Sequence, residues 1–233
     1  GSAEFDVYTD NNYHTDPSAW YHLVVAVDTT QGTAANRVKL YLNGVQITSS
    51  NGLNSSTSYP DQNYDTSFND DVKHWLGRDV SDEASFDGYL AETVLVDGQQ
   101  LDPTSFGEFD EDSPKIWKPK NVSGLTFGTN GFYLDYEDSS NLGNDASGGT
   151  DLTEVNIAST DQTTDTCTNN FATFNPLIIY YPTYVSTLSD GNLTATRSDN
   201  GGNHSTIMPT QGKWYAEFKC ITKGSGVSHV GAI

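Results

Sequence analysis

The chain has 233 residues, enough for one large β domain or two small ones, and carries 11 Lys and Arg against 31 Asp and Glu, a formal net charge of −20. A surface this negative repels phosphate backbones and anionic lipids, which excludes nucleic-acid binding and membrane association as main functions, and no apolar run approaches the roughly 18–20 residues of a membrane helix. The acids are 23 Asp and 8 Glu; because Asp favours turns, the composition predicts short strands joined by polar turns rather than a helical bundle.

The clearest local pattern lies near the amino end of the chain. Residues 20–27 form a β-rich run with apolar side chains on both faces, which predicts an inner strand. Apolar residues alternate over 38–42, and the dipeptide Asn43-Gly44 that follows favours a type I′ turn. Such a turn places Leu42 opposite Val45, so that the apolar residues of both strands share one face. The sequence therefore predicts a β-hairpin.

Weaker signals follow along the chain. Residues 49–71 are rich in Ser, Asn, Asp and Tyr without a period, which predicts a long loop, and long loops in compact domains are often functional. Short strands are expected over 74–77 and 86–96. Asp102 followed by Pro103 predicts an N-cap and a single helical turn that ends at Phe106.

The composition changes near Pro114–Pro119. Residues 138–170 are polar with few large side chains, as in a linker or an extended surface segment. Trp20 and Trp214 begin apolar runs and are expected to be core residues. Cys167 and Cys220 fit neither a disulfide framework nor a zinc site and are expected to be inert thiols. The further strands predicted in this half are residues 132–136, 193–197, 214–221 and 227–233.

Three motifs resemble the central strands of concanavalin A-like (laminin G-like) jelly rolls. They are Trp20-Tyr21-His22-Leu23-Val24, Arg37-Val38-Lys39-Leu40-Tyr41-Leu42-Asn43-Gly44 and Gly88-Tyr89-Leu90-Ala91-Glu92. Their order is the one found in that family. The resemblance implies an all-β fold, an antiparallel jelly-roll β-sandwich.

A wider set of segments resembles lectin-like structural proteins of marine phages, in which a laminin G-like module precedes a SPRY-like β-sandwich. The segments are residues 16–22, 28–31, 106–109, 128–134, 169–173 and 212–218. The resemblance implies a laminin G-like jelly roll over 1–119, an extended polar linker over 120–185 and the beginning of a SPRY-like sandwich over 186–233. It also implies that the first jelly-roll strands precede residue 1, so we expect a piece of a longer polypeptide.

An acidic segment approaches the signature of laminarinase-type glycosidases, which share this fold. On a strand, Glu108, Asp110 and Asp112 would lie on one face, as a nucleophile, a helper and an acid require. The third position is Asp rather than Glu, and Ser113-Pro114 follows directly. We therefore expect an exposed acidic turn and no enzyme activity, with glycoside hydrolysis as the alternative.

Oxygen-bearing side chains gather in two loop segments. They are Asp10, Asn11, Asn12 and Asp16 in the first, and Asp61, Asp65, Asn69, Asp70 and Asp71 in the second. Calcium prefers six to eight oxygen ligands, and related lectins often bind it near their sugar site. Asp10, Asn12, Asp16, Asp70 and Asp71 are the candidate ligands. The alternative is that these are solvated loops of an acidic protein.

Trp75 is the candidate sugar-stacking residue. It stands beside the long polar loop, with Tyr59, Tyr64 and Arg78 nearby in sequence. Aromatic rings stack on the apolar face of a sugar while polar groups reach its hydroxyls. The alternative is that Trp75 packs in the core.

The resemblance implies a function by analogy of fold. We expect a phage virion surface or tail-fibre protein, located on the virion, that binds host cell-surface glycans and assembles with other fibre subunits as a homo-oligomer. A purely structural fibre or decoration protein without a ligand is the alternative. Calcium is the one cofactor expected.

Overall fold

Short strands and turns make up almost all of the secondary structure, which confirms the predicted all-β class. The structure is a computed structural model. It contains two compact units, Gly1–Gln162 with Thr166–Asn169, and Thr163–Asp165 with Asn170–Ile233. The residues that the structure describes are 5–10, 19–79, 85–86, 88–179, 186–197, 202–208 and 210–222.

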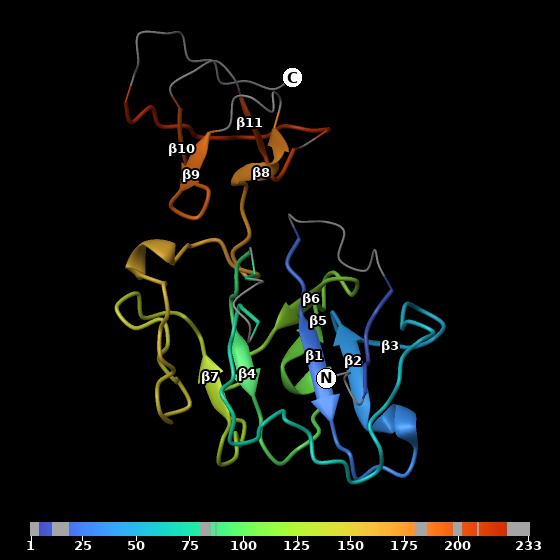
Figure 1. Cartoon of the computed structure of the whole chain (residues 1–233). Helices are drawn as coiled ribbons and strands as arrows, with labels where there is room; N and C mark the ends of the chain where they lie inside the picture. Colours follow the sequence, from blue (N-terminus) through green and yellow to red (C-terminus); the bar gives the residue numbers. More distant parts are fainter. Residues whose placement is uncertain are drawn as a thin grey trace. The chain divides into compact units, whose positions relative to one another are not determined.

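Among the residues that the structure describes, the first unit contains seven strands and three 3-10 helices. Figure 1 labels these strands β1 to β7. The strands are β1 (Leu23–Val27), β2 (Val38–Leu42), β3 (Val45–Ile47), β4 (Thr93–Leu95), β5 (Gly107–Phe109), β6 (Trp117–Pro119) and β7 (Phe132–Leu134). The helices are η1 (Ala34–Asn36), η2 (Pro103–Ser105) and η3 (Ser159–Asp161).

The predicted hairpin is confirmed in detail. β2 and β3 pair antiparallel, with Leu42 opposite Val45 and Leu40 opposite Ile47. The turn residues Asn43 and Gly44 have φ angles of 47° and 79°, as a type I′ turn requires. Ile47 is buried, which fixes the apolar face of the hairpin towards the core.

β1 completes a sheet of order β1-β2-β3, drawn in blue in Figure 1. Among the described residues it pairs with β2 alone, so it is an edge strand rather than the inner strand that its sequence predicts. Leu23 and Val25 are accordingly 55% and 51% exposed. An apolar run shows that a strand has two apolar faces, but not which segments cover them.

Two further pairs of strands complete the first unit. β4 pairs antiparallel with β7, and β5 pairs antiparallel with β6. Within the described residues, β4 is the only part of the strand expected over 86–96 that forms. Residues 74–77 form no strand, and an isolated bridge pairs the next residue, Arg78, with Ser85. The predicted cap is confirmed, because Asp102 Oδ1 accepts the backbone N–H of Thr104 at 2.8 Å before η2.

Part of the segment expected to be a linker takes part in the first unit. β7 lies in it, and buried Val122, Leu134 and Leu142 belong to the core. Asp145, which is 5% exposed, accepts the backbone N–H of Tyr133 at 2.9 Å through Oδ1. Carboxylates thus hold this polar stretch in place by hydrogen bonds, without regular secondary structure. The domain boundaries expected from the sequence, after residues 119 and 185, stay a prediction.

The second unit contains two strand pairs, β8 with β11 and β9 with β10. The bounds are β8 (Phe174–Ile179), β9 (Thr187–Ser189), β10 (Thr194–Thr196) and β11 (Asn203–Ser205). β10 confirms the strand predicted over 193–197. The strand predicted over 214–221 is wrong, and Trp214 is 68% exposed rather than a core residue. The strand predicted over 227–233 lies outside the described residues.

Candidate functional site

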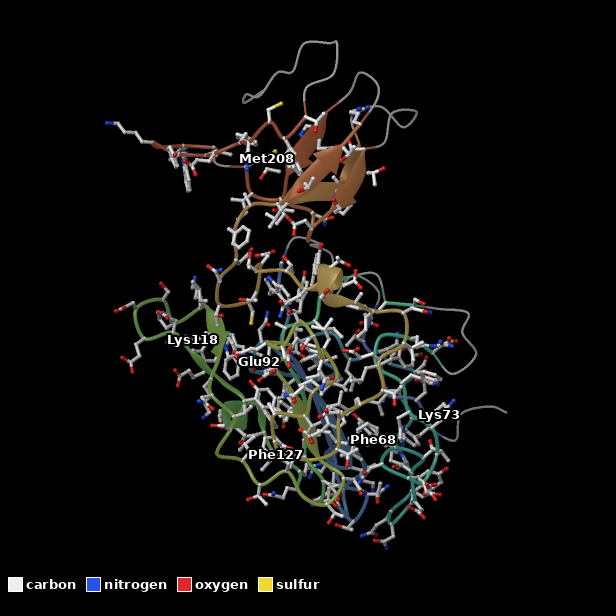
Figure 2. The ribbon with its side chains drawn as sticks, turned by 90° about the vertical axis from the view of Figure 1, so that its left-hand side faces the viewer. Phe68, Lys73, Glu92, Lys118, Phe127 and Met208 are labelled. Carbon is white, nitrogen blue, oxygen red and sulfur yellow. The ribbon has the colours of Figure 1, made fainter. Side chains whose placement is uncertain are left out.

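Trp75 lies half-buried between two cations. The guanidinium carbon of Arg78 lies 4.3 Å from the centre of the Trp75 ring, and Lys73 Nζ lies 4.8 Å from it. Lys73 is labelled in Figure 2. Cation–π contacts contribute about 0.5–1 kcal/mol each at exposed sites, so both help to hold the ring in place. The site therefore combines an aromatic ring with N–H donors.

Only one of these two cations is a candidate site residue from the sequence. Arg78 is a candidate because it lies near Trp75 in sequence, without a predicted contact to the ring, whereas Lys73, two positions before Trp75, was missed. His74 between them turns elsewhere, with Nε2 3.2 Å from the backbone oxygen of Asp70. The ring of Trp75 is thus contacted by one cation that precedes it in the sequence and by one that follows it.

The two candidate tyrosines lie in different surroundings. The ring of Tyr64 packs edge-on against Phe5, with centroids 5.9 Å apart, and Tyr59 precedes the buried Pro60. Both tyrosines are half-buried. Their participation in a sugar site with Trp75 stays a prediction.

Arg37 organises the loops around Tyr59 and was not anticipated from the sequence. Its Nε donates to the carbonyl of Gln31 at 2.8 Å, one terminal nitrogen to that of Pro60 at 2.7 Å, and the other to that of Gly32 at 3.2 Å. A guanidinium can satisfy several carbonyls at once because its donors are arranged as a rigid fork. Arg37 therefore joins the 28–36 loop to the loop that follows Tyr59.

The candidate calcium ligands are used partly for local hydrogen bonds. Asp10 Oδ1 accepts the side-chain amide of Asn54 at 2.8 Å, and Asp70 Oδ1 accepts the backbone N–H of Asp71 at 2.8 Å. Asn12 and Asp16 lie outside the described residues. Within the described part of the chain, no three His, Cys, Asp or Glu side chains are grouped to hold a metal ion. The candidate carboxylates that the structure describes are thus not grouped as metal ligands, and calcium binding stays a prediction.

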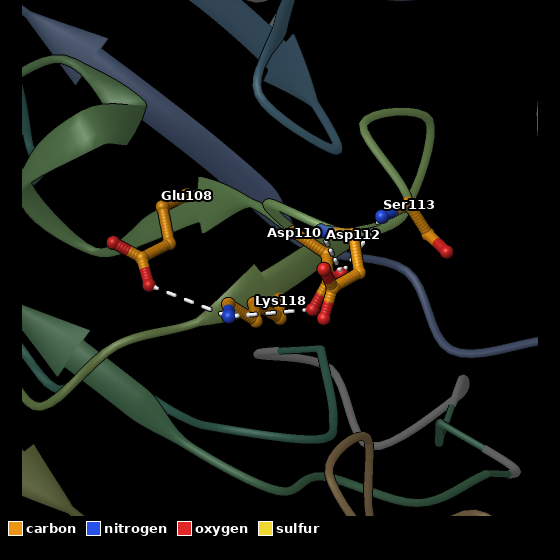
Figure 3. Close-up of polar contacts among 5 residues, drawn as sticks. All are labelled: Glu108, Asp110, Asp112, Ser113 and Lys118. Atoms are coloured by element: carbon orange, nitrogen blue, oxygen red, sulfur yellow. Dashed lines mark hydrogen bonds and ion pairs between the residues drawn. The ribbon is translucent and has the colours of Figure 1, made fainter.

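The acidic segment after β5 forms a capped turn (Figure 3). Asp110 Oδ1 accepts the backbone N–H groups of Asp112 at 3.0 Å and Ser113 at 2.9 Å. Lys118 Nζ lies 3.3 Å from Asp110 Oδ2 and 3.7 Å from Glu108 Oε1. The hydrogen bond from Ser113, followed by that from Lys118, holds the pKa of Asp110 below its usual value. Asp110 is thus ionised and stabilises the turn.

A group with raised pKa values lies where β4 meets β7. Burial, followed by repulsion from Asp135 and Glu137, raises the pKa of Glu92, the acid of the third jelly-roll motif. Burial and the charge of Glu92 raise the pKa of Tyr133 to about 12. Burial also raises the pKa of Cys167, so its thiol is protonated at neutral pH. No local pattern in the sequence indicates that these groups interact.

Residues 1–101 match the family model of the concanavalin A-like lectin/glucanases superfamily. The match supports a β-sandwich jelly roll for this region, and the name of the matched superfamily joins lectins with glucanases. The match contains the hairpin β2–β3 and the Trp75 site. Searches of curated proteins and of solved structures gave no match. No helix among the described residues is both long and apolar enough to cross a membrane.

Proposed function

We propose that this chain is part of a phage virion surface or tail-fibre protein whose jelly-roll module binds host cell-surface glycans. The superfamily match over residues 1–101 supports carbohydrate binding. The resemblance of segments beyond that region to lectin-like phage proteins supports the location on the virion, the SPRY-like second sandwich and assembly with other fibre subunits as a homo-oligomer.

The arrangement around Trp75 is the observation that carries the proposal. A neutral sugar offers an apolar face and a ring of hydroxyls, so it is recognised by stacking together with hydrogen bonds. Trp75 supplies the ring. Lys73 Nζ lies 4.8 Å from its centre and the guanidinium carbon of Arg78 lies 4.3 Å from it, and both side chains carry N–H groups that can donate to a hydroxyl oxygen. Asp70 and Asp71 precede Lys73 in the chain, and their carboxylates can accept from hydroxyls.

The proposed module binds glycans without cleaving them. Laminarinase-type glycosidases need a nucleophile, a helper and an acid on one face of a strand. Asp110, in the helper position, instead caps a turn and pairs with Lys118, and β5 ends at Phe109, before the acid position Asp112. This supports a module without enzyme activity, and turnover of laminarin-type polymers by the purified chain would contradict it.

Glycan-array binding by the chain and by Trp75→Ala tests the proposal. We expect the purified chain to bind a set of glycans and Trp75→Ala to lose at least tenfold in affinity with an unchanged melting temperature. Trp214→Ala is the matched control, because Trp214 is an exposed tryptophan of the second unit. If Trp75→Ala keeps full binding, the sugar site lies elsewhere. If Trp75→Ala instead lowers the free energy of unfolding by about 3–5 kcal/mol, as truncation of a core residue does, with a correspondingly lower melting temperature, Trp75 is structural. A chain that binds no glycan favours the purely structural fibre protein.

A further inference from the structure

Trp117 connects two separate strand groups of the first unit. It begins β6, and its ring lies against Gly107 of the same hairpin and against Gly44 in the turn between β2 and β3. Its indole Nε1–H donates a hydrogen bond of 3.0 Å to Nδ1 of His22, the residue before β1. The aromatic ring of Phe109 packs edge-on against it, with centroids 5.0 Å apart. The β5–β6 hairpin is thus attached to the three-stranded sheet through one indole ring.

His22 is held in position by the hairpin turn. Its backbone N–H donates to Oδ1 of Asn43 at 2.8 Å, and its carbonyl accepts the N–H of Asn43 at 2.8 Å. The imidazole is half-buried, and its ring centre lies 5.8 Å from that of Trp117. The backbone of His22 is therefore tied to the turn while its ring faces the indole.

This hydrogen bond exists in one protonation state only. The indole nitrogen is a donor and never an acceptor, so Nδ1 of His22 must be unprotonated and the imidazole proton must lie on Nε2. An imidazolium carries a proton on both nitrogens, which would direct an N–H of His22 at the N–H of Trp117. Protonation exchanges an attractive contact for a repulsive one.

The charged groups on the strands around the pair do not cause the shift in the pKa of His22. Among the described residues, the ionisable ones on β1, β2, β3, β5 and β6 or directly beside these strands and His22 are Tyr21, Asp28, Arg37, Lys39, Tyr41, Glu108, Asp110, Lys118 and Lys120. Lys118 pairs with Glu108 and Asp110 along the β5–β6 hairpin, where two carboxylates face one ammonium. Burial lowers the pKa of His22 from its ordinary value, because the charged form loses its hydration.

We propose that His22 and Trp117 form a pH-sensitive latch that fastens the β5–β6 hairpin to the β1-β2-β3 sheet and opens when His22 is protonated. The neutral imidazole is favoured in the folded state, so the stabilisation is complete above the unfolded-state pKa of about 6.5. It is lost as the pH falls from that value through the lower pKa of the folded state. The latch is therefore closed at neutral pH and weakened in mildly acidic surroundings.

NMR of the whole chain tests the latch directly. The side-chain resonances of His22 and the indole N–H cross-peak of Trp117 are followed from pH 7.5 to pH 4.5. We expect both to change with the same midpoint, below 6.5, and Trp117→Phe, which removes the donor but keeps an aromatic ring, to shift the midpoint of His22. A Trp117 cross-peak that does not move while His22 titrates would overturn the proposal.

A variant separates this effect from the general acid sensitivity of a protein with 31 acidic residues. His22→Asn keeps an acceptor close to the position of Nδ1 but does not titrate. Between pH 7.5 and 5.0 we expect its melting temperature to fall by several degrees less than that of the wild-type chain. His74→Asn, at an exposed histidine, should follow the wild-type profile. Equal profiles for His22→Asn and wild type would refute the latch, and if His22→Asn does not fold, the Trp117→Phe titration decides.

Discussion

Replacing Gly44 by Ala should destabilise the first unit far more than the same change at Gly98. Both glycines have a left-handed backbone, with φ angles of 79° and 80°. A Cβ on Gly44 would overlap Cε3 and Cζ3 of Trp117, whereas a Cβ on Gly98 would meet nothing within 4 Å. The two substitutions therefore share the backbone strain and differ in the contact with Trp117.

The expected magnitudes follow from these two contributions. A non-glycine residue in the left-handed region costs about 1–2 kcal/mol, and forcing an extra carbon into a packed contact costs about 1–3 kcal/mol. Gly98→Ala should thus lower the free energy of unfolding by about 1–2 kcal/mol and Gly44→Ala by about 2–5 kcal/mol. Urea unfolding of both variants, followed by far-ultraviolet circular dichroism, measures the difference.

A double-mutant cycle identifies the cause. In a Trp117→Ala background the ring is absent, so Gly44→Ala should lose its excess over Gly98→Ala and retain only the backbone strain. Equal destabilisation by the two glycine variants in the wild-type background would show that Trp117 does not pack on the turn, and would also remove the structural basis of the latch.

Two further predictions concern the loops. Arg37→Lys keeps the positive charge but loses the planar guanidinium that donates to the carbonyls of Gln31, Gly32 and Pro60. The free energy of unfolding should therefore fall by about 2–4 kcal/mol. An unchanged denaturation midpoint would refute this role of Arg37. If calcium binds to the folded chain, a chelator should lower the melting temperature, because a ligand specific for the native state stabilises it by mass action. Monovalent salt must keep the ionic strength constant, since screening alone changes the stability of a chain with a net charge of −20, and identical melts would exclude calcium.

The sequence by itself determined the features that depend on neighbouring residues. Alternation over 38–42 and the Asn43-Gly44 dipeptide fixed the hairpin and its register, because side-chain period and turn conformation are local properties. The Asp102 cap followed for the same reason. At the candidate sugar site, Arg78 is a candidate beside Trp75 because it lies only three positions after it in the sequence.

Tertiary structure alone decided which distant segments meet. A strand exists only where a partner satisfies its backbone groups, so apolar alternation over 214–221 and the short run at 74–77 produced none in the described chain, and β1 lies at an edge. Trp117 and His22 are 95 residues apart and Arg37 reaches Pro60 across 23 residues. Neither contact has a local signature, because indole and guanidinium donors bind whichever acceptor the packed chain brings within reach.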